Sequence, residues 1–510
     1  MIKHEILSYI HALRPILYIP SHDFHAVDNE LREIIGRAEV KEFCEGLGAV
    51  DFKTKSRQAE CTLSEFLNQY KDEGYDKETF LLLKDVHGHL LNDAPGHQLD
   101  LKVMALLKYI SERTIYWPDY QQTVIIVSGE LAIPKELEHF ITIIPQELPD
   151  QKKIEDHIRA YAEDQGFAIG EGDIGELALE LKGFSIFQVK QVLNLAYANS
   201  GEISISDREL ILAEKKQLIH KSGLLEYIEV DEQLISIGGL EGLKEWLRRK
   251  AKIFHHLDAA LKNGVDLPKG ILMLGFPGCG KSLTAKATAS EFEVPLIRLD
   301  VGKILGKYVG ESERNMRAAL AQAEAISPCV LWIDEIEKAF STGANAHEVT
   351  TRLVGHFLTW MQEKTSTVFV VATANDLERL PTEFLRKGRF DEIFFVDLPI
   401  PQERLQILKI HLKKRKQYDS ALDISSIVEN TKDFSGADLE AGVAIAVEDN
   451  FLKQFEENKN NSPATVSADD LSRAFSMITP LSKALEKKFK DMKEKLKEYN
   501  LRPAQAQAKP

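Results

Sequence analysis

The sequence contains 510 residues, which is enough for two or three domains with separate hydrophobic cores. Its hydrophobic content of 44% and charged content of 28% are ordinary for a soluble globular protein, and its formal net charge of −15 argues against a broad nucleic-acid-binding surface. The four cysteines are far apart and form no CxxC pair, which argues against a disulfide framework or a zinc cluster and favours a reducing compartment.

The N-terminal stretch "MIKHEILSYIHALRPILYIP" contains no long uncharged apolar run, so we expect no secretory signal. Eighteen consecutive apolar residues occur nowhere, so we expect no membrane span. The sequence therefore predicts a soluble, cytoplasmic protein.

Three short apolar runs in the first half predict buried strands: 15–20, 80–84 and 123–128. Asp85 follows the second run, as the metal-linked acid of many ATPases follows a strand. However, Val86 stands where a hydrolysing enzyme needs a carboxylate, and no Gly-Lys-Ser follows the first run. Four histidines suggest a metal site, but they lack closely spaced further ligands and we interpret them as surface or core residues: His22, His25, His87 and His89.

Residues 216–234 are expected to form a linker with an entering helix, and a phosphate-binding motif follows. Residues 270–282 read "GILMLGFPGCGKS", a short apolar strand that runs into G-x-x-x-x-G-K-S, and a helical pattern comes next. Glycines such as Gly275 and Gly280 let backbone N–H groups turn inward, and the helix N-terminus adds its positive dipole end. Lys281 can then reach the β and γ phosphates, and the Ser282 hydroxyl can bind magnesium.

Two further strand ends carry polar residues that suit hydrolysis. In "PCVLWIDEIEKAF", Asp334 and Glu335 follow a buried strand, where Asp334 is suited to hold magnesium and Glu335 to act as the general base. In "TVFVVATAND", Asn375 ends another buried strand and could orient the attacking water; the alternative is a capping asparagine in the turn.

From about residue 225 to 480 these motifs, in this order, resemble the AAA-type ATPase family. "SIGGLEGLKEWL" resembles the opening segment of the family, which implies adenine contacts from the backbone of Ile237 and Gly238. "ILKIHLKK" places His411 at the nucleotide, and "FSGADLE" places Gly436 and Ala437 at the adenine side of a helical lid. The resemblance implies ATP and Mg²⁺ as cofactors and a parallel five-stranded sheet with a helical lid. It also assigns the rest of the phosphate loop to the nucleotide site: Phe276, Pro277, Gly278, Cys279 and Leu283.

"EFLRKGRFDEIFFVDLP" resembles the second homology region of the family. The resemblance implies that Arg386 and Arg389 point into the active site of a neighbouring subunit, and hence a homo-oligomeric ring, most often a hexamer. An arginine finger can accelerate phosphoryl transfer by roughly 10³–10⁵. The alternative is an intramolecular salt bridge.

"GKYVGESE" resembles the first pore loop of these rings. In the family an aromatic residue at this place grips extended polypeptide, which assigns that role to Tyr308, within a loop that also includes Lys307, Val309 and Gly310. The alternative is a partly buried tyrosine at a strand–helix junction.

Two departures from the family pattern stand out. Cys279 stands where threonine is common in the family. A small residue suffices at this position, and redox control through the thiol is the alternative. "GADLEAG" lacks the lid arginine found in some members, and several subfamilies share this lack.

Spacing indicates that the first half repeats the second. Asp334 precedes Phe434 by 100 residues (434 − 334), and Asp85 precedes Phe184 by 99 (184 − 85). Such repetition favours a degenerate AAA-like α/β module in the first half, which has lost its phosphate loop and its sensor residue. A module of this kind would recruit an adaptor or add a second tier to the ring. The alternative is an unrelated α/β domain with chance spacing.

After the lid, Ser467 is expected to begin a helix, residues 481–499 form a helical pattern with one apolar stripe, and "RPAQAQAKP" is expected to be disordered. The predicted organisation is a degenerate AAA-like domain, a linker, an ATPase core, a helical lid, and a C-terminal helix with its tail: 1–215, 216–234, 235–400, 401–480 and 481–510.

This layout resembles AAA domain proteins encoded in chloroplast and cyanobacterial genomes, which implies bacterial cytosol or plastid stroma. The leading hypothesis is an ATP-hydrolysing ring that remodels or threads a protein partner. A nucleotide-gated assembly scaffold with slow turnover is the alternative, and a nucleic-acid motor is a weaker one.

Overall fold

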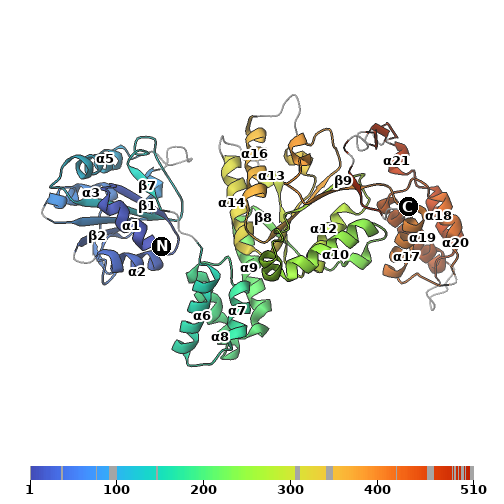
Figure 1. The fold of residues 1–510 in the computed structure, drawn as a ribbon, viewed down its shortest axis with the longest axis horizontal. Helices are drawn as coiled ribbons and strands as arrows, with labels where there is room; N and C mark the ends of the chain where they lie inside the picture. Colours follow the sequence, from blue (N-terminus) through green and yellow to red (C-terminus); the bar gives the residue numbers. More distant parts are fainter. Residues whose placement is uncertain are drawn as a thin grey trace. The chain divides into compact units, whose positions relative to one another are not determined.

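A computed structural model gives the structure of the chain. It describes residues 2–35, 38–75, 77–90, 100–144, 148–304, 311–340, 348–420, 422–456 and 465–484, together with 486–487, 490–491, 493–494, 499 and 501–505. The chain forms two compact units: residues 1–178 with 184–202 (the N-terminal unit), and residues 179–183 with 203–510 (the C-terminal unit). Both are α/β structures (Figure 1).

The C-terminal unit is built on a seven-stranded sheet in the order β14-β13-β9-β12-β11-β10-β8. Its strands are β8 (Leu225–Ile228), β9 (Gly270–Gly275), β10 (Leu296–Leu299), β11 (Cys329–Ile333), β12 (Val368–Ala374), β13 (Glu392–Val396) and β14 (Arg502–Pro503). The five strands from β13 to β10 are all parallel, whereas β8 runs antiparallel to β10 at one edge. The predicted five parallel strands are therefore the centre of a larger sheet.

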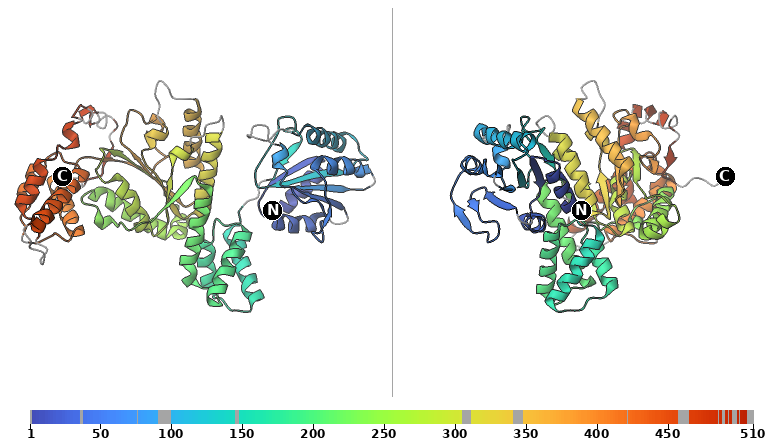
Figure 2. Two further views of the ribbon diagram at one scale, coloured as in Figure 1. Left: turned by 180° about the vertical axis from the view of Figure 1, so that it is seen from behind. Right: turned by 60° about the vertical axis from the view of Figure 1, so that its left-hand side comes forward.

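Helices cover both faces of this sheet, which explains why its central strands are almost wholly apolar. One face packs against α10 (Glu241–His255) and α12 (Lys281–Phe292), and the other against α14 (Glu311–Ile326) and α16 (Glu348–Glu363). Figures 1 and 2 show these two helical layers on either side of the strands. Shorter helical elements connect these strands and helices: η2 (Ile205–Asp207), η3 (Leu234–Ser236), α11 (Leu257–Lys262), α13 (Val301–Ile304), α15 (Ile336–Ala339) and η4 (Thr382–Leu385).

A bundle of four helices follows the sheet and forms a core of its own: α17 (Pro401–Lys414), α18 (Ser425–Asn430), α19 (Gly436–Glu456) and α20 (Ala468–Ser476). Ser467 caps α20 by accepting the backbone N–H of Asp470, so the predicted helix start is confirmed. This bundle is the expected helical lid.

The N-terminal unit repeats the same sheet. Its order is β4-β3-β2-β5-β6-β1-β7, and the five strands from β7 to β2 are parallel in the same succession as β13 to β10. The strands are β1 (Ile16–Pro20), β2 (Glu39–Cys44), β3 (Gly48–Val50), β4 (Arg57–Ala59), β5 (Thr79–Lys84), β6 (Gln122–Ser128) and β7 (Ile141–Ile143). This identical strand order confirms the predicted internal repeat over the alternative of chance spacing.

Helices again lie on both faces of this sheet, and a group of helices follows it along the chain. The first set is α1 (Ile2–His11), α2 (Phe24–Ile35), α3 (Leu63–Tyr70), η1 (Glu73–Tyr75), α4 (His87–Leu90) and α5 (Leu101–Tyr116). The second set is α6 (Gln151–Gln165), α7 (Glu171–Glu180) and α8 (Ile186–Ser200).

Two strands were not expected from the sequence. Residues 216–234 include the end of a helix, α9 (Arg208–Ser222), and also the edge strand β8. The expectation that residues 502–510 are disordered is wrong at 502–505, because β14 pairs in parallel with β13. Both are strands of two to four residues, which are too short to show a periodic pattern and are held by the neighbouring strand.

The C-terminal helix is described only in part: α21 (Leu481–Ala484) begins where expected, and several residues of its predicted apolar stripe lie outside the described residues. Among the helices that the structure describes, none combines the length and the hydropathy of a membrane-spanning segment.

Candidate nucleotide site

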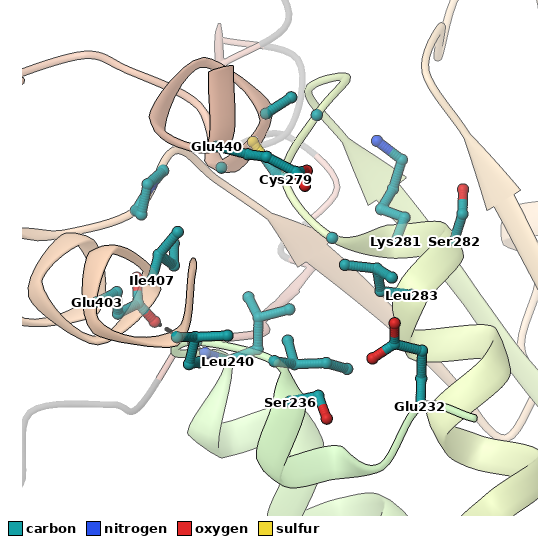
Figure 3. A pocket seen from close by; sticks show the side chains of 18 of the residues that line it. Glu232, Ser236, Leu240, Cys279, Lys281, Ser282, Leu283, Glu403, Ile407 and Glu440 are labelled. Atoms are coloured by element: carbon teal, nitrogen blue, oxygen red, sulfur yellow. Dashed lines mark hydrogen bonds between the residues drawn. The ribbon is translucent and has the colours of Figure 1, made fainter. Parts of the chain in front are cut away.

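A cavity of about 930 Å³ opens between the sheet and the lid of the C-terminal unit. Its walls are the β9–α12 loop, the ends of β11 and β12, the segment before α10, and the lid helices α17 and α19. Figure 3 shows Lys281 and Ser282 at the start of α12, with Glu403, Ile407 and Glu440 on the lid side. Most of the predicted site residues line this one cavity: Ile237, Gly238, Pro277, Gly278, Cys279, Gly280, Lys281, Ser282, Leu283, Asp334, Glu335, Asn375, His411, Gly436 and Ala437.

The phosphate loop is shaped by backbone conformations that favour glycine. Gly278 and Gly280 have φ of +74° and +90°, and a Cβ on Gly278 would lie 2.9 Å from the Ala437 Cβ of the lid. The loop leads directly into α12, whose first N–H groups have no partner within the helix. The loop can therefore receive an anionic group.

Lys281 lies buried under this loop. Its Nζ donates to the carbonyl oxygens of Gly275, at 2.9 Å, and Phe276, at 2.7 Å. Gly275 and Phe276 do not line the cavity themselves, and their part in the site is this contact with Lys281. Burial lowers the pKa of Lys281 to about 8, against the opposing effect of nearby acidic groups.

Hard oxygen ligands gather beside Lys281. The Ser282 hydroxyl lies 3.4 Å from Asp334 Oδ1, and the Thr373 hydroxyl donates to the same oxygen at 2.5 Å. No cluster of three or more metal-binding side chains occurs among the described residues. One or two carboxylates and a hydroxyl nevertheless suit Mg²⁺, which completes its shell with water and substrate phosphate oxygens. Ser282 and Asp334 therefore fit the expected metal.

A chain of hydrogen bonds links the C-terminal ends of β11 and β12. Asn375 Nδ2 donates to Glu335 Oε1 at 3.1 Å, and Lys338 forms an ion pair with the other carboxylate oxygen. The Glu335 backbone N–H donates to Thr373 Oγ1 at 3.0 Å. Glu335 is thus held at its backbone N–H and at Oε1, while Oε2 pairs with the solvent-exposed Lys338.

Glu337 and Thr373 belong to this network, although sequence reasoning missed both. Glu337 is 3% exposed, its Oε1 accepts the Asn375 backbone N–H at 2.9 Å, and burial raises its pKa. Its Oε2 and Asn375 Oδ1 are buried without a hydrogen-bond partner among the described residues. The signal for Thr373 was available, because residues two apart on a strand point to the same side.

The opposite end of the cavity is built around Ile237 and Gly238. The next two residues are held by the lid: the Gly239 N–H donates to Gln406 Oε1 and the Leu240 N–H to Glu403 Oε1, both at 2.9 Å. Glu403 and Gln406 were not predicted. A glutamate near a helix start carries no signal for a bond to a segment more than 160 residues earlier.

The lid also contributes His411, Gly436 and Ala437. The Ala437 N–H donates to the Gly278 carbonyl at 3.0 Å, so that the lid closes directly on the phosphate loop. Burial lowers the pKa of His411, which keeps the imidazole neutral at physiological pH, and Glu440 lies 3.6 Å from its Nδ1.

Cys279 lies buried in the same wall. Burial raises its pKa to about 12, and its Sγ lies 3.7 Å from the Pro277 carbonyl. Because the thiolate is the reactive form, this environment argues against the alternative of redox control.

Arg386 and Arg389 do not line the cavity. Arg386 is exposed and has no hydrogen-bonded or ion-paired side-chain partner in the part of the chain that the structure describes. Arg389 donates to the Glu383 carbonyl of its own chain. Among the described residues, no acidic side chain pairs with either arginine to form the intramolecular salt bridge of the alternative. The predicted pore-loop residues Lys307, Tyr308, Val309 and Gly310 lie outside the described residues.

The corresponding strand ends of the N-terminal unit carry different side chains. Asp85 has φ +56°, like Glu335 with φ +50°, and both stand 99 residues before the matching phenylalanine (184 − 85 and 434 − 335). By backbone conformation Asp85 therefore matches Glu335 and not Asp334, which corrects the sequence comparison by one residue. Lys84 occupies the place of Asp334.

Lys84 is buried in an ion cluster, with its Nζ 2.8 Å from Asp28 and 2.8 Å from Glu42, and Lys55 pairs with the same two acids. The first turn of α2 is capped by Asp23, which accepts the Ala26 N–H at 3.0 Å. In the N-terminal unit, the Asp23 carboxylate thus lies where a phosphate would meet the helix start, and the Lys84 ammonium lies where a metal ion would be held.

The exposed His22 ring lies against Gly129. A Cβ on Gly129, the counterpart of Asn375, would lie 1.9 Å from it. A side chain longer than that of glycine at this position would therefore collide with His22.

Comparison with known families agrees with this geometry. The model of the ATPase family associated with various cellular activities (AAA) matches residues 271–398. The N-terminal domain of SpoVK-like AAA ATPases matches residues 2–145, and their second domain matches 151–222. The fold and the site therefore define an AAA ATPase module preceded by SpoVK-like domains.

Relatives extend over nearly the whole chain. It is 33% identical over 491 residues to "Uncharacterized AAA domain-containing protein ycf46" of Trieres chinensis, covering 94% of this chain and 93% of the relative. The ycf46 protein of Guillardia theta is 37% identical over 418 residues, covering 81% and 78%. The chain belongs to this family of AAA domain-containing proteins. A shorter match, 36% over 253 residues, is to "Putative ribosome biogenesis ATPase nvl" of Dictyostelium discoideum, covering 48% of this chain and 29% of that protein.

Proposed function

We propose that this chain hydrolyses ATP with Mg²⁺ and, as a homo-oligomeric ring, uses that reaction to remodel or thread a protein partner. The observation that supports hydrolysis best is the fixed Glu335 carboxylate, held by Asn375 beside Asp334 and facing the same cavity as Lys281. A site that only binds nucleotide does not need a carboxylate fixed in this way.

The residues have distinct roles in this proposal. Lys281 and the N–H groups at the start of α12 hold the phosphates, and Ser282 and Asp334 hold Mg²⁺. Bound Mg²⁺ neutralises charge that develops on the phosphate oxygens. Glu335 takes the proton of the attacking water, and Asn375 orients the carboxylate and the water.

The adenine end consists of the Ile237–Gly238 backbone, His411, Gly436 and Ala437. The neutral imidazole of His411 suits an uncharged base.

Arg386 and Arg389 are proposed to act on the site of the neighbouring subunit. The exposed Arg386, without a side-chain partner among the described residues, is free to serve a second chain. If so, a monomer hydrolyses ATP poorly and a hexameric or similar ring hydrolyses it well. Tyr308 is proposed to transmit the force, and the N-terminal unit to bind an adaptor or client. The compartment proposed is bacterial cytosol or plastid stroma.

The test is the ATPase rate per subunit against protein concentration, with mass measured by light scattering in the same samples. We expect specific activity to rise with assembly, and Arg386→Ala to abolish it without changing the mass. Arg379→Ala is the matched control. Arg379 lies on the same connection between β12 and β13 as Arg386, its side chain is 70% exposed, and it pairs with Asp376. A monomer with a concentration-independent rate would instead favour a nucleotide-gated scaffold. Stimulation by RNA or DNA that falls steeply with salt would favour the nucleic-acid motor.

A further inference from the structure

The C-terminal segment 501–505 is built into the ATPase core. Its strand β14 pairs with β13 through Phe394 with Arg502 and Phe395 with Pro503, and the Ala504 N–H donates to the Phe395 carbonyl at 2.8 Å. Ala504 is fully buried, and Leu501 packs against the cores on both faces of the sheet. An exposed sheet edge readily pairs with another chain, and here the edge is covered by the chain's own end.

The same segment caps α10. The Ala504 carbonyl accepts the Leu243 N–H at 3.0 Å, one of the first-turn donors that a helix cannot satisfy by itself. The fit is close at Gly242, where a Cβ would lie 2.7 Å from the Gln505 carbonyl oxygen. Helix α10 starts directly after the segment that lines the far end of the cavity, and Lys244 in its first turn donates to the Ile237 carbonyl at 2.7 Å.

A second set of contacts reaches Asp397, which follows β13 and lines the cavity just before the lid. Gln505 Nε2 donates to the Asp397 carbonyl at 3.2 Å. Lys493 Nζ lies 3.1 Å from Asp397 Oδ1. The C-terminal segment is therefore bonded to both chain segments that flank the nucleotide cavity, the one before α10 and the one before the lid.

We propose that residues 501–505 position the nucleotide site, and that the groove between β13 and the first turn of α10 is a peptide-binding groove filled by the chain's own C-terminus. This inference rests on the proposed binding of ATP. Its bond to the lining of the cavity, among the described residues, is the one from Gln505 to the Asp397 carbonyl, so it acts through the backbone at Asp397 and through the start of α10. Strand addition to a sheet edge, with one small residue buried, is a common way to recognise an extended peptide.

Two variants of the full chain test the positioning role. Ala504→Glu puts a charge where no solvent reaches, and Lys493→Ala removes the ion pair with Asp397. Lys490→Ala is the matched control, because Lys490 is 71% exposed and pairs only with Glu486 among the described residues. We expect the Kd of a fluorescent ATP analogue to rise about tenfold for Ala504→Glu and less for Lys493→Ala, with kcat at saturating ATP within about twofold of wild type. Equal Kd values for Ala504→Glu and wild type would overturn the proposal.

A milder variant of the full chain covers the case in which Ala504→Glu fails to fold. Gln505→Ala keeps strand β14 and removes only the hydrogen bond to the Asp397 carbonyl. A raised Kd for the ATP analogue, with the same thermal unfolding midpoint as wild type, supports the positioning role. A Kd equal to that of wild type overturns it. If wild type itself does not bind the analogue, the proposed function fails first, and the two failures are distinguishable.

Discussion

The side-chain amide of Asn375 donates to the Glu335 carboxylate over 3.1 Å, while its backbone N–H donates to Glu337 over 2.9 Å. Glu337 therefore fixes the backbone of Asn375 at the end of β12, and the Asn375 side chain fixes the carboxylate of Glu335. The position of the proposed base depends on strand β12 as well as on its own strand, β11.

Removal of either member of this pair is expected to separate binding from hydrolysis. Glu335→Gln should bind ATP normally and lower kcat by about 100-fold, because the water loses its proton acceptor. Asn375→Ala should lower kcat by at least about tenfold. Lys338→Ala should have little effect, because that ion pair is exposed to solvent. Steady-state ATPase rates and nucleotide titrations measure both quantities, and undiminished hydrolysis by Glu335→Gln would remove Glu335 as the base.

Glu337 is expected to act by position and not by charge. Glu337→Gln keeps an oxygen that can accept the Asn375 N–H, so its kcat should stay near wild type. Glu337→Ala should lower kcat by about tenfold with little change in KM, because a small misplacement of a catalytic group is costly. A kcat for Glu337→Ala equal to that of wild type would show that Asn375 holds its place without this acid.

ATP affinity should fall as pH rises above 8. Burial lowers the pKa of Lys281 to about 8, so its amine is charged below that pH and neutral above it. Phosphate favours the charged form, and binding at higher pH therefore requires proton uptake. Calorimetry in two buffers of different ionisation enthalpy should show that uptake at pH 8.5 and much less at pH 6.5. Affinity that is constant from pH 7 to 9.5 would contradict the assignment of Lys281 to the phosphates.

Lys215 should reduce the stability of the C-terminal unit below pH 8. It is 6% exposed on α9, and burial lowers its pKa to about 8 from 10.5. The unfolded chain therefore holds this proton up to higher pH than the folded one, so stability rises between pH 8 and about 10. Lys215→Met should raise the free energy of unfolding at pH 7 by at most about 3 kcal/mol and reduce that rise.

Denaturant titrations at pH 7 and pH 9.5 measure both effects. Lys216→Met is the control. Lys216 is more exposed than Lys215 and pairs with Glu229, so we expect this substitution not to raise the free energy of unfolding. If both lysine variants shift stability alike, burial of Lys215 is not the cause.

The chain should bind one nucleotide. The ion cluster of Lys84 fills the metal position of the N-terminal unit, and Asp23 caps its helix. Lys281→Ala should therefore abolish all binding measured by calorimetry. Lys84→Met should leave nucleotide affinity unchanged and destabilise the N-terminal unit by about 3 kcal/mol or more, because it leaves two buried acids with one lysine fewer. A stoichiometry of two would refute this prediction.

Local motifs with a backbone requirement were predictable from sequence. Gly278, Gly280 and Lys281 stand at fixed offsets because a phosphate loop needs them there, and Asp334 and Asn375 follow apolar runs that end at one sheet edge. The internal repeat was also predictable, because insertions had not disturbed the spacing between its strands.

Contacts between distant segments were not predictable. Glu403 reaches Leu240, and Ala504 reaches Leu243, across more than 160 and 260 residues respectively. Neither contact imposes a repeating pattern on the sequence. The shift of one residue at Asp85 had a similar cause, since only its positive φ shows that it matches Glu335.

The side chains at the strand ends of the N-terminal unit have a consequence for how the protein senses its surroundings. If the N-terminal unit binds no nucleotide, as predicted above, we expect it to keep the same shape whether cellular ATP is abundant or scarce. Such a unit can serve as a constant reference surface, recognised by a partner independently of energy supply. Any change in that recognition during a reaction cycle must then originate outside this fold, in the C-terminal unit.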